Sequence, residues 1–228
     1  MKRIITIFEF VLSIMLIACV SPMPDGVDRT VKVDSFEVPI DAEISVVGMV
    51  ADMAIIYVDA VELSEVAETI VRGEVLQTYY TDFDAHPWTF YDLKISAVYR
   101  GDLGINDTIT VCEYGGYIRG SVWSKLYGEG RTDEPISEDV LYFFSFFGAP
   151  LPKAGDEYVL FLVEEPSIAG TFSLVGDFMG KYVVNGESVS RHTPESEPYF
   201  YYARGYYVPD QSTIGELKKA INTTQIMQ

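Results

Sequence analysis

The chain has 228 residues with 16 Lys or Arg against 34 Asp or Glu, so its formal net charge at pH 7 is −18. Such an acidic protein repels nucleic-acid phosphates and anionic lipid headgroups, so we expect no nucleic-acid partner and no electrostatic docking on a membrane. Aromatic residues make up 14% of the chain, which favours strands over helices. The length suits one domain, since all-β domains run to roughly 200–250 residues as single units.

The first 18 residues have the pattern of an export signal. Lys2 and Arg3 give a short positive start, and a mostly apolar run follows over residues 4–17, interrupted by Glu9. That run is too short for a transmembrane helix, which takes about 20 residues. We therefore expect residues 1–18 to be a signal peptide that is removed on export.

The apolar run ends in Leu16-Ile17-Ala18-Cys19, which resembles the lipobox of bacterial lipoproteins. The resemblance implies transfer of diacylglycerol to the Cys19 sulfur and cleavage of the chain before Cys19. Two acyl chains anchor a protein far better than one. The expected localisation is extracytoplasmic, at the cell membrane or outer envelope, with membrane contact through the N-terminal lipid. An ordinary secretory peptide with a chance cysteine, or an uncleaved N-terminal helix, is the alternative.

Residues 19–43 are predicted to be a lipid-anchored tether. Pro22, Pro24, Gly26 and Pro39 lie there among many charges with little periodicity. Residues 44–228 are then expected to form the single folded domain.

Short apolar segments separated by turns predict a series of strands from Ile44 onward. Asn185-Gly186 is typical of a tight hairpin turn. The segment over 55–58 is either a strand of its own or the end of one broken strand that begins at residue 44. The expected strands cover residues 44–50, 55–58, 71–79, 88–99, 107–112, 157–163, 171–175, 181–184 and 187–189. In the strand over 88–99, one face is expected to carry Leu93, Ile95, Ala97 and Tyr99, and the other face Asp92, Lys94 and Ser96.

Two short helices are also predicted. Residues 62–69 carry apolar side chains at helical spacing, and Thr213 with Glu216 matches a capping box at the start of a C-terminal helix. We therefore expect a mainly β fold, a small OB-like antiparallel barrel that is closed or partly open, with one short internal helix and a C-terminal helix.

Five short segments resemble a pattern found in uncharacterised secreted or lipid-anchored bacterial domains with OB-like barrels. They are Val71–Val75, Val98–Asp102, Ile109–Val111, Gly115-Gly116 and Gly155–Leu162. Residues 117–151 depart from the compact version of that pattern and are expected to be an insertion. The resemblance implies no catalytic residues.

Aromatic loops are the predicted ligand-binding feature, because aromatic faces stack on sugars or peptide while a Tyr hydroxyl adds a hydrogen bond. The candidate side chains lie in one stretch: Tyr199, Tyr201, Tyr202, Tyr206 and Tyr207. A second aromatic run covers residues 142–147 in the insertion. The alternative for both runs is that they extend the core.

No motif predicts a catalytic residue, a metal site or a cofactor. The chain has no HExxH, CxxC, GxSxG or Walker A pattern. Residues 82–87 fail as a calcium loop, because His86 and Pro87 stand where an oxygen ligand and a glycine belong, and they predict a hairpin loop. Cys112, in a β-rich stretch, is expected to be a buried small side chain.

These observations predict a monomeric binding or interaction module with a protein or glycan partner. One alternative is a secreted hydrolase with a carboxylate pair in the insertion cleft. Another is a netrin-like protease inhibitor, which requires a disulfide-pinned N-terminal wedge and is incompatible with a lipidated Cys19.

Overall fold

The chain forms two sheets, described by a computed structural model over residues 35–36, 38–39, 41–49, 57, 59–82, 86–127, 136–146, 148–192 and 211–226. The strands are β1 Ile44–Met49, β2 Thr69–Thr81, β3 Trp88–Arg100, β4 Thr108–Tyr114, β5 Gly116–Arg119, β6 Leu141–Phe146, β7 Glu157–Glu164, β8 Thr171–Leu174, β9 Lys181–Asn185, β10 Ser188–Arg191 and β11 Gln211–Thr213. The helices are α2 Ala60–Val66, α3 Gly120–Tyr127 and α5 Ile214–Ile226, with a 3-10 turn η2 over Asp177–Gly180.

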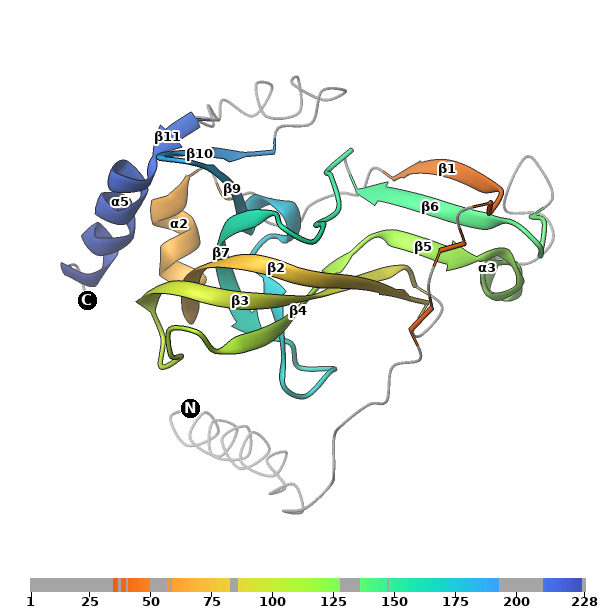
Figure 1. Cartoon of the computed structure of the whole chain (residues 1–228), viewed down its shortest axis with the longest axis horizontal. Helices are drawn as coiled ribbons and strands as arrows, with labels where there is room; N and C mark the ends of the chain where they lie inside the picture. The colour runs from red at the N-terminus through yellow and green to blue at the C-terminus, as the bar shows by residue number, and fades with distance from the viewer. Residues whose placement is uncertain are drawn as a thin grey trace, which may run out of the picture. The chain divides into compact units, whose positions relative to one another are not determined.

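Five strands of the larger sheet close into a barrel in the order β2-β3-β4-β8-β7, because β7 pairs with both β2 and β8 (Figure 1). The predicted mainly β fold with an OB-like barrel and a C-terminal helix is confirmed. One pairing, β4 with β8, is parallel. Strand direction cannot alternate all the way round a ring of five, so an entirely antiparallel closed barrel is impossible and one pair must be parallel.

The barrel interior follows the period-2 alternation of its strands. Tyr91, Leu93 and Ile95 of β3 point inward into an apolar cluster, as the alternation around Leu93 predicts. The same alternation wrongly places Tyr99 on this inner face. The β2–β3 register shifts between Arg72 and Gly73, so Tyr99 instead packs against the cluster outside the barrel.

Two helices cover the outside of β7 and β9, and α2 and α5 lie next to each other there (Figure 1). Helix α2 begins two residues earlier than predicted, because the Asp59 carboxylate accepts a hydrogen bond from the Val61 N–H at 2.8 Å. It ends at Val66, whose side chain is exposed rather than on the predicted apolar face. The capping box of α5 is confirmed by Thr213 N–H to Glu216 at 2.9 Å and Glu216 N–H to the Thr213 hydroxyl at 3.2 Å.

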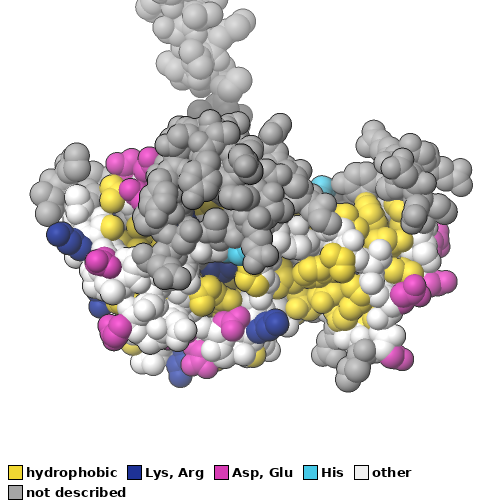
Figure 2. Space-filling view, turned by 90° about the horizontal axis from the view of Figure 1, so that it is seen from above, with side chains coloured by type: hydrophobic (Ala, Val, Ile, Leu, Met, Phe, Trp, Pro, Cys, Tyr) yellow, Lys and Arg dark blue, Asp and Glu magenta, His cyan; other side chains and the backbone are white. Residues whose placement is uncertain are grey.

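The predicted insertion supplies most of the second sheet, which has the order β1-β6-β5. It also contains α3, a second internal helix that the sequence pattern did not predict. Tyr142 and Phe144 of β6 are buried with Ile118 and Trp123, so part of the aromatic run over 142–147 forms a core. Figure 2 shows hydrophobic side chains gathered over this end of the molecule, and Val46 on the edge strand β1 is 71% exposed.

Candidate functional site

A cleft of about 920 Å³ lies along one edge of β2. One side is the β2 edge and the outer face of the neighbouring strands, and the other side is the N-terminal segment around residue 36. The lining residues are Ser35, Phe36, Val38, Gln77, Thr78, Tyr79, Tyr80, Asp92 and Thr110. This volume lies at the upper end of the roughly 300–1,000 Å³ that small-molecule sites occupy.

The edge of β2 is available because β7 stops pairing with it. The β2–β7 ladder ends at Glu74, and the β2–β3 register then shifts around the exposed residue Leu76. Beyond Val75, the one ladder bond that this edge makes within the described residues runs from the Phe36 N–H to the Tyr80 carbonyl, at 2.9 Å. Strand β2 is therefore a central strand between β3 and β7 in its first half and an edge strand in its second half.

Three polar side chains from three neighbouring strands meet on the floor of the cleft. Asp92 of β3 is the direct cross-strand neighbour of Gln77 on β2 and of Thr110 on β4. Its carboxylate accepts hydrogen bonds from the Gln77 amide at 2.6 Å and from the Thr110 hydroxyl at 3.0 Å. These bonds hold an amide, a carboxylate and a hydroxyl in a fixed arrangement that faces the cleft.

Aromatic rings flank this polar floor. Tyr79 stacks on Phe90 with 5.5 Å between ring centroids, and Tyr80 meets Tyr117 edge-on at 4.8 Å. Burial raises the pKa of the Tyr79 hydroxyl, Asp92 raises it further, and a hydrogen bond with Thr110 lowers it. Burial likewise raises the pKa of Tyr80. Both phenols therefore stay neutral at neutral pH and can donate a hydrogen bond as well as stack.

Phe36 forms the opposite wall of the cleft. The Arg119 guanidinium lies over its ring at 5.3 Å from the centroid. Arg119 is itself held by two hydrogen bonds of 2.7 Å to the buried carboxylate of Asp82.

The lining favours binding of a polar, uncharged ligand. Asp92 is the one carboxylate among the lining residues that the structure describes, and both its oxygens already accept hydrogen bonds. Amide, hydroxyl and carboxylate groups beside aromatic rings suit recognition of a ligand rich in hydroxyl groups.

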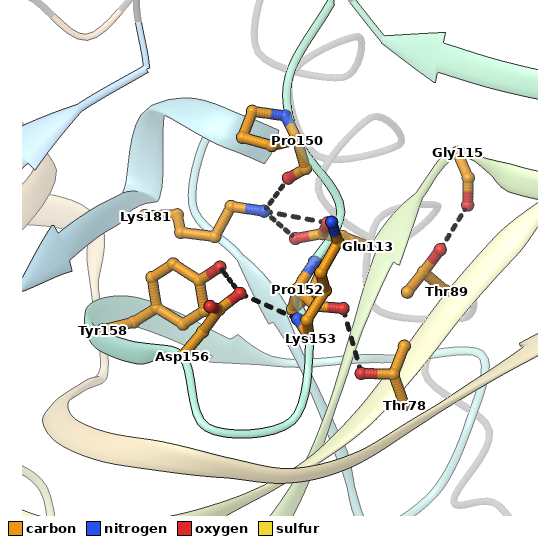
Figure 3. Close-up of polar contacts among 10 residues, drawn as sticks. All are labelled: Thr78, Thr89, Glu113, Gly115, Pro150, Pro152, Lys153, Asp156, Tyr158 and Lys181. Atoms are coloured by element: carbon orange, nitrogen blue, oxygen red, sulfur yellow. Dashed lines mark hydrogen bonds and ion pairs between the residues drawn. The ribbon is translucent and has the colours of Figure 1, made fainter.

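A buried ion pair near one end of the barrel is the second candidate site (Figure 3). Lys181 of β9 donates to both carboxylate oxygens of Glu113 at 2.9 and 2.8 Å and to the Pro150 carbonyl at 3.2 Å. Lys181 is 2% exposed and Glu113 is 8% exposed. Burial raises the pKa of Glu113 more than the Lys181 charge lowers it.

The size of the cavity beside Glu113 indicates whether the ion pair could act on a substrate. The cavity that Glu113 lines measures about 10 Å³, which is room for about one water molecule and for no substrate. Figure 3 shows that the pair lies beside the connection from β6 to β7, where Pro150 accepts from Lys181 and Pro152 accepts from Thr78. The pair therefore fastens this connection to the barrel.

The predicted site residues fall outside the cleft or outside the described chain. Cys19, which is the predicted lipidation site, and the candidate ligand-binding residues Tyr199, Tyr201, Tyr202, Tyr206 and Tyr207 lie outside the described residues. The segment over 82–87 connects β2 to β3, so the predicted hairpin is confirmed. Cys112 is fully buried, as predicted, beside Phe90 and Ile168.

Sequence reasoning missed the residues that form the cleft. It placed Asp92 on the outer face of its strand, but the strand pattern carried no information about which strands would be its neighbours. Asp92 lies between Gln77 and Thr110 on the neighbouring strands, and this arrangement can be recognised only when the register of strand pairing is known. Glu113 and Lys181 were missed for the same reason, since 68 positions separate them.

No family model matches the sequence, and no curated protein matches it. Among the described residues, no three or more His, Cys, Asp or Glu side chains are grouped so as to hold a metal ion. The described helices include none with the length and apolar character needed to cross a membrane.

Proposed function

We propose that this chain is a lipid-anchored binding protein of the cell envelope, and that the cleft along β2 binds a neutral oligosaccharide. The anchor is the predicted lipid on Cys19, and the folded domain is the binding module. No catalytic step is part of the proposal.

Fold and charge together support this ligand class. OB-fold barrels bind oligonucleotides and oligosaccharides on their strand faces and adjoining loops. A net charge of −18 disfavours the oligonucleotide, whose phosphates bind through Lys and Arg. Fold alone does not specify function, so the ligand class follows from the side chains of the cleft.

The observation that carries the proposal is the arrangement of Gln77, Asp92 and Thr110 beside Tyr79. Sugars present hydroxyl groups at their edges and C–H groups on their faces. The three polar side chains match the edges, and the neutral phenol next to them matches a face.

Two other functions have less support. A hydrolase in the insertion would need a carboxylate pair in a cleft, whereas the acidic residues that the structure describes there, Glu138 and Asp139, are exposed on a turn and line neither cavity described above. A netrin-like inhibitor would need Cys112 in a disulfide, whereas Cys112 is a buried free thiol.

The test is a binding measurement on the full chain with four neutral probes, namely chitotriose, cellotriose, maltotriose and xylotriose. We expect at least one to bind by calorimetry, and Asp92→Ala to weaken that binding about tenfold, which corresponds to about 1.4 kcal/mol. Asp102→Ala is the matched control, because it removes the same charge from an exposed turn away from the cleft. Absence of binding to all four probes, or equal losses in the two variants, would contradict the proposal.

A further inference from the structure

The cleft is incomplete without the segment that precedes the barrel. Ser35, Phe36 and Val38 supply one wall, and the edge of β2 from Gln77 to Tyr80 supplies the facing one. The segment belongs to the part of the chain that the sequence predicts to be the tether, residues 19–43. The same residues therefore serve a binding site and a connection to the membrane.

The two walls differ in how firmly they are held. The β2 wall is part of the barrel sheet through its pairing with β3. For the N-terminal wall, the contacts of the described residues are the Phe36 N–H to Tyr80 carbonyl bond and the Arg119 contact with the Phe36 ring. Asp82 fixes Arg119 through both carboxylate oxygens, so the guanidinium keeps its place whether or not Phe36 is docked.

We infer that ligand binding in the cleft and docking of Ser35, Phe36 and Val38 are coupled, with Phe36 as the residue that transmits the coupling. This inference rests on the proposed function. A ligand that touches both walls binds more tightly when the segment is docked, and by reciprocity a bound ligand favours the docked segment. Occupancy of the cleft thus sets how much of the tether is free.

The coupling has a geometric consequence at the membrane. Undocking adds at most residues 35–42 to the connection between Cys19 and the folded domain, because the Glu43 carbonyl still accepts a hydrogen bond from the Leu141 N–H at 3.1 Å. Eight residues extend to roughly 26–29 Å at about 3.3–3.6 Å each. A ligand-free domain therefore has a longer reach from the membrane than a ligand-bound one.

Hydrogen exchange on the full chain tests the coupling. The amides around Phe36 and those of β2 from Gln77 to Tyr80 are followed with and without the four trisaccharides at saturating concentration. We expect the ligand to slow exchange at both places, by about tenfold at Phe36. Protection of β2 without protection of Phe36 would overturn the coupling and leave the proposed function standing. Absence of protection at both places would overturn both.

Substitution of Phe36 is the second test of the coupling. Phe36→Ala is expected to weaken oligosaccharide binding about fivefold, because the ligand then gains no contact from docking the segment. Phe36→Tyr keeps the ring and should retain wild-type affinity. Ile44→Ala is the control, since it removes an exposed apolar side chain outside the cleft. Wild-type affinity in Phe36→Ala would refute the inference, whatever the exchange data show.

Discussion

Burial of ionisable side chains governs the chemistry of individual residues in this barrel. Glu113 and Lys181 neutralise each other where both are buried, and Tyr91 places in the same interior a hydroxyl that has no hydrogen-bond partner among the described residues. Burial raises the pKa of Tyr91, and the neighbouring Glu113 charge adds to the effect. A buried pair of this kind contributes little net stability as a pair, but either member alone is costly.

Removing one partner of the pair should therefore be far worse than removing both. We expect Lys181→Met to lower the free energy of unfolding by about 3–5 kcal/mol, because it leaves Glu113 buried without a counter-charge. The double variant Glu113→Leu, Lys181→Met should recover most of that loss. Urea unfolding measures both. Arg72→Met is the control, since Arg72 and Glu157 form a partly exposed pair worth about 1 kcal/mol or less. A double variant as unstable as the single one would show that the pair is intrinsically stabilising.

Cys112 should make the fold sensitive to alkali. Burial, with smaller contributions from Glu165 and Glu113, raises the pKa of its thiol from 9.0 to about 12. The folded state thus keeps a proton that the unfolded state loses, so stability is full below about pH 9 and declines as pH rises towards 12. The Cys112 thiol lowers the free energy of unfolding by up to about 1.4 kcal/mol for each pH unit in this range. Urea unfolding between pH 8 and pH 10.5 should show a smaller slope in Cys112→Ala than in wild type, and equal slopes would refute this assignment.

At the scale of elements, strands that leave the barrel build both the cleft and the second sheet. Strand β2 loses β7 as a neighbour after Glu74 and becomes an edge, which opens the cleft. Strand β4 ends at Tyr114, and the chain continues as β5 in the other sheet. Gly115 and Gly116 allow that change, since their φ angles are +111° and +120°.

The junction between the sheets should not tolerate a side chain. Gly116→Ala would place a Cβ 2.5 Å from the Thr89 hydroxyl, in addition to the strain of a positive φ. We expect a loss of more than about 1 kcal/mol in unfolding free energy. Gly148→Ala separates the two causes, because Gly148 also has a positive φ but its Cβ would meet nothing within 4 Å. If both variants lost the same stability, the contact with Thr89 would be irrelevant.

For the whole molecule, a strongly acidic domain on a lipid anchor would bind ligands without adhering to anionic surfaces. The charge of −18 repels phosphate-bearing partners and headgroups, so membrane contact would depend on the lipid alone. The barrel provides the face that would bind, and the proposed tether over residues 19–43 would join that face to the membrane.

The anchor itself is tested by fractionation. Cys19→Ala removes the thiol that would carry the diacylglycerol, so the protein should move from the detergent phase to the aqueous phase and its mass should lack the acyl groups. Ser21→Ala serves as the neighbouring control and should leave partitioning unchanged. A Cys19→Ala protein that stayed in the detergent phase would contradict the lipid anchor.

Features that depend on neighbouring residues could be predicted from the sequence alone. Period-2 alternation marked the long strands, Asn185-Gly186 marked the hairpin that pairs Val184 with Val189, and Thr213 with Glu216 marked the start of α5. Each of these signals lies within a few neighbouring residues, so no knowledge of the distant chain is needed.

The position of the candidate site, in contrast, depends on how distant parts of the chain pack together. The cleft depends on the register that brings Asp92 beside Gln77 and Thr110, and on the departure of β7 from β2. The small sheet likewise required β1 to pair with β6, almost one hundred positions away. A strand pattern fixes which face a side chain occupies, but register and closure come from packing of the whole chain, so the neighbours of each face emerge only in the fold.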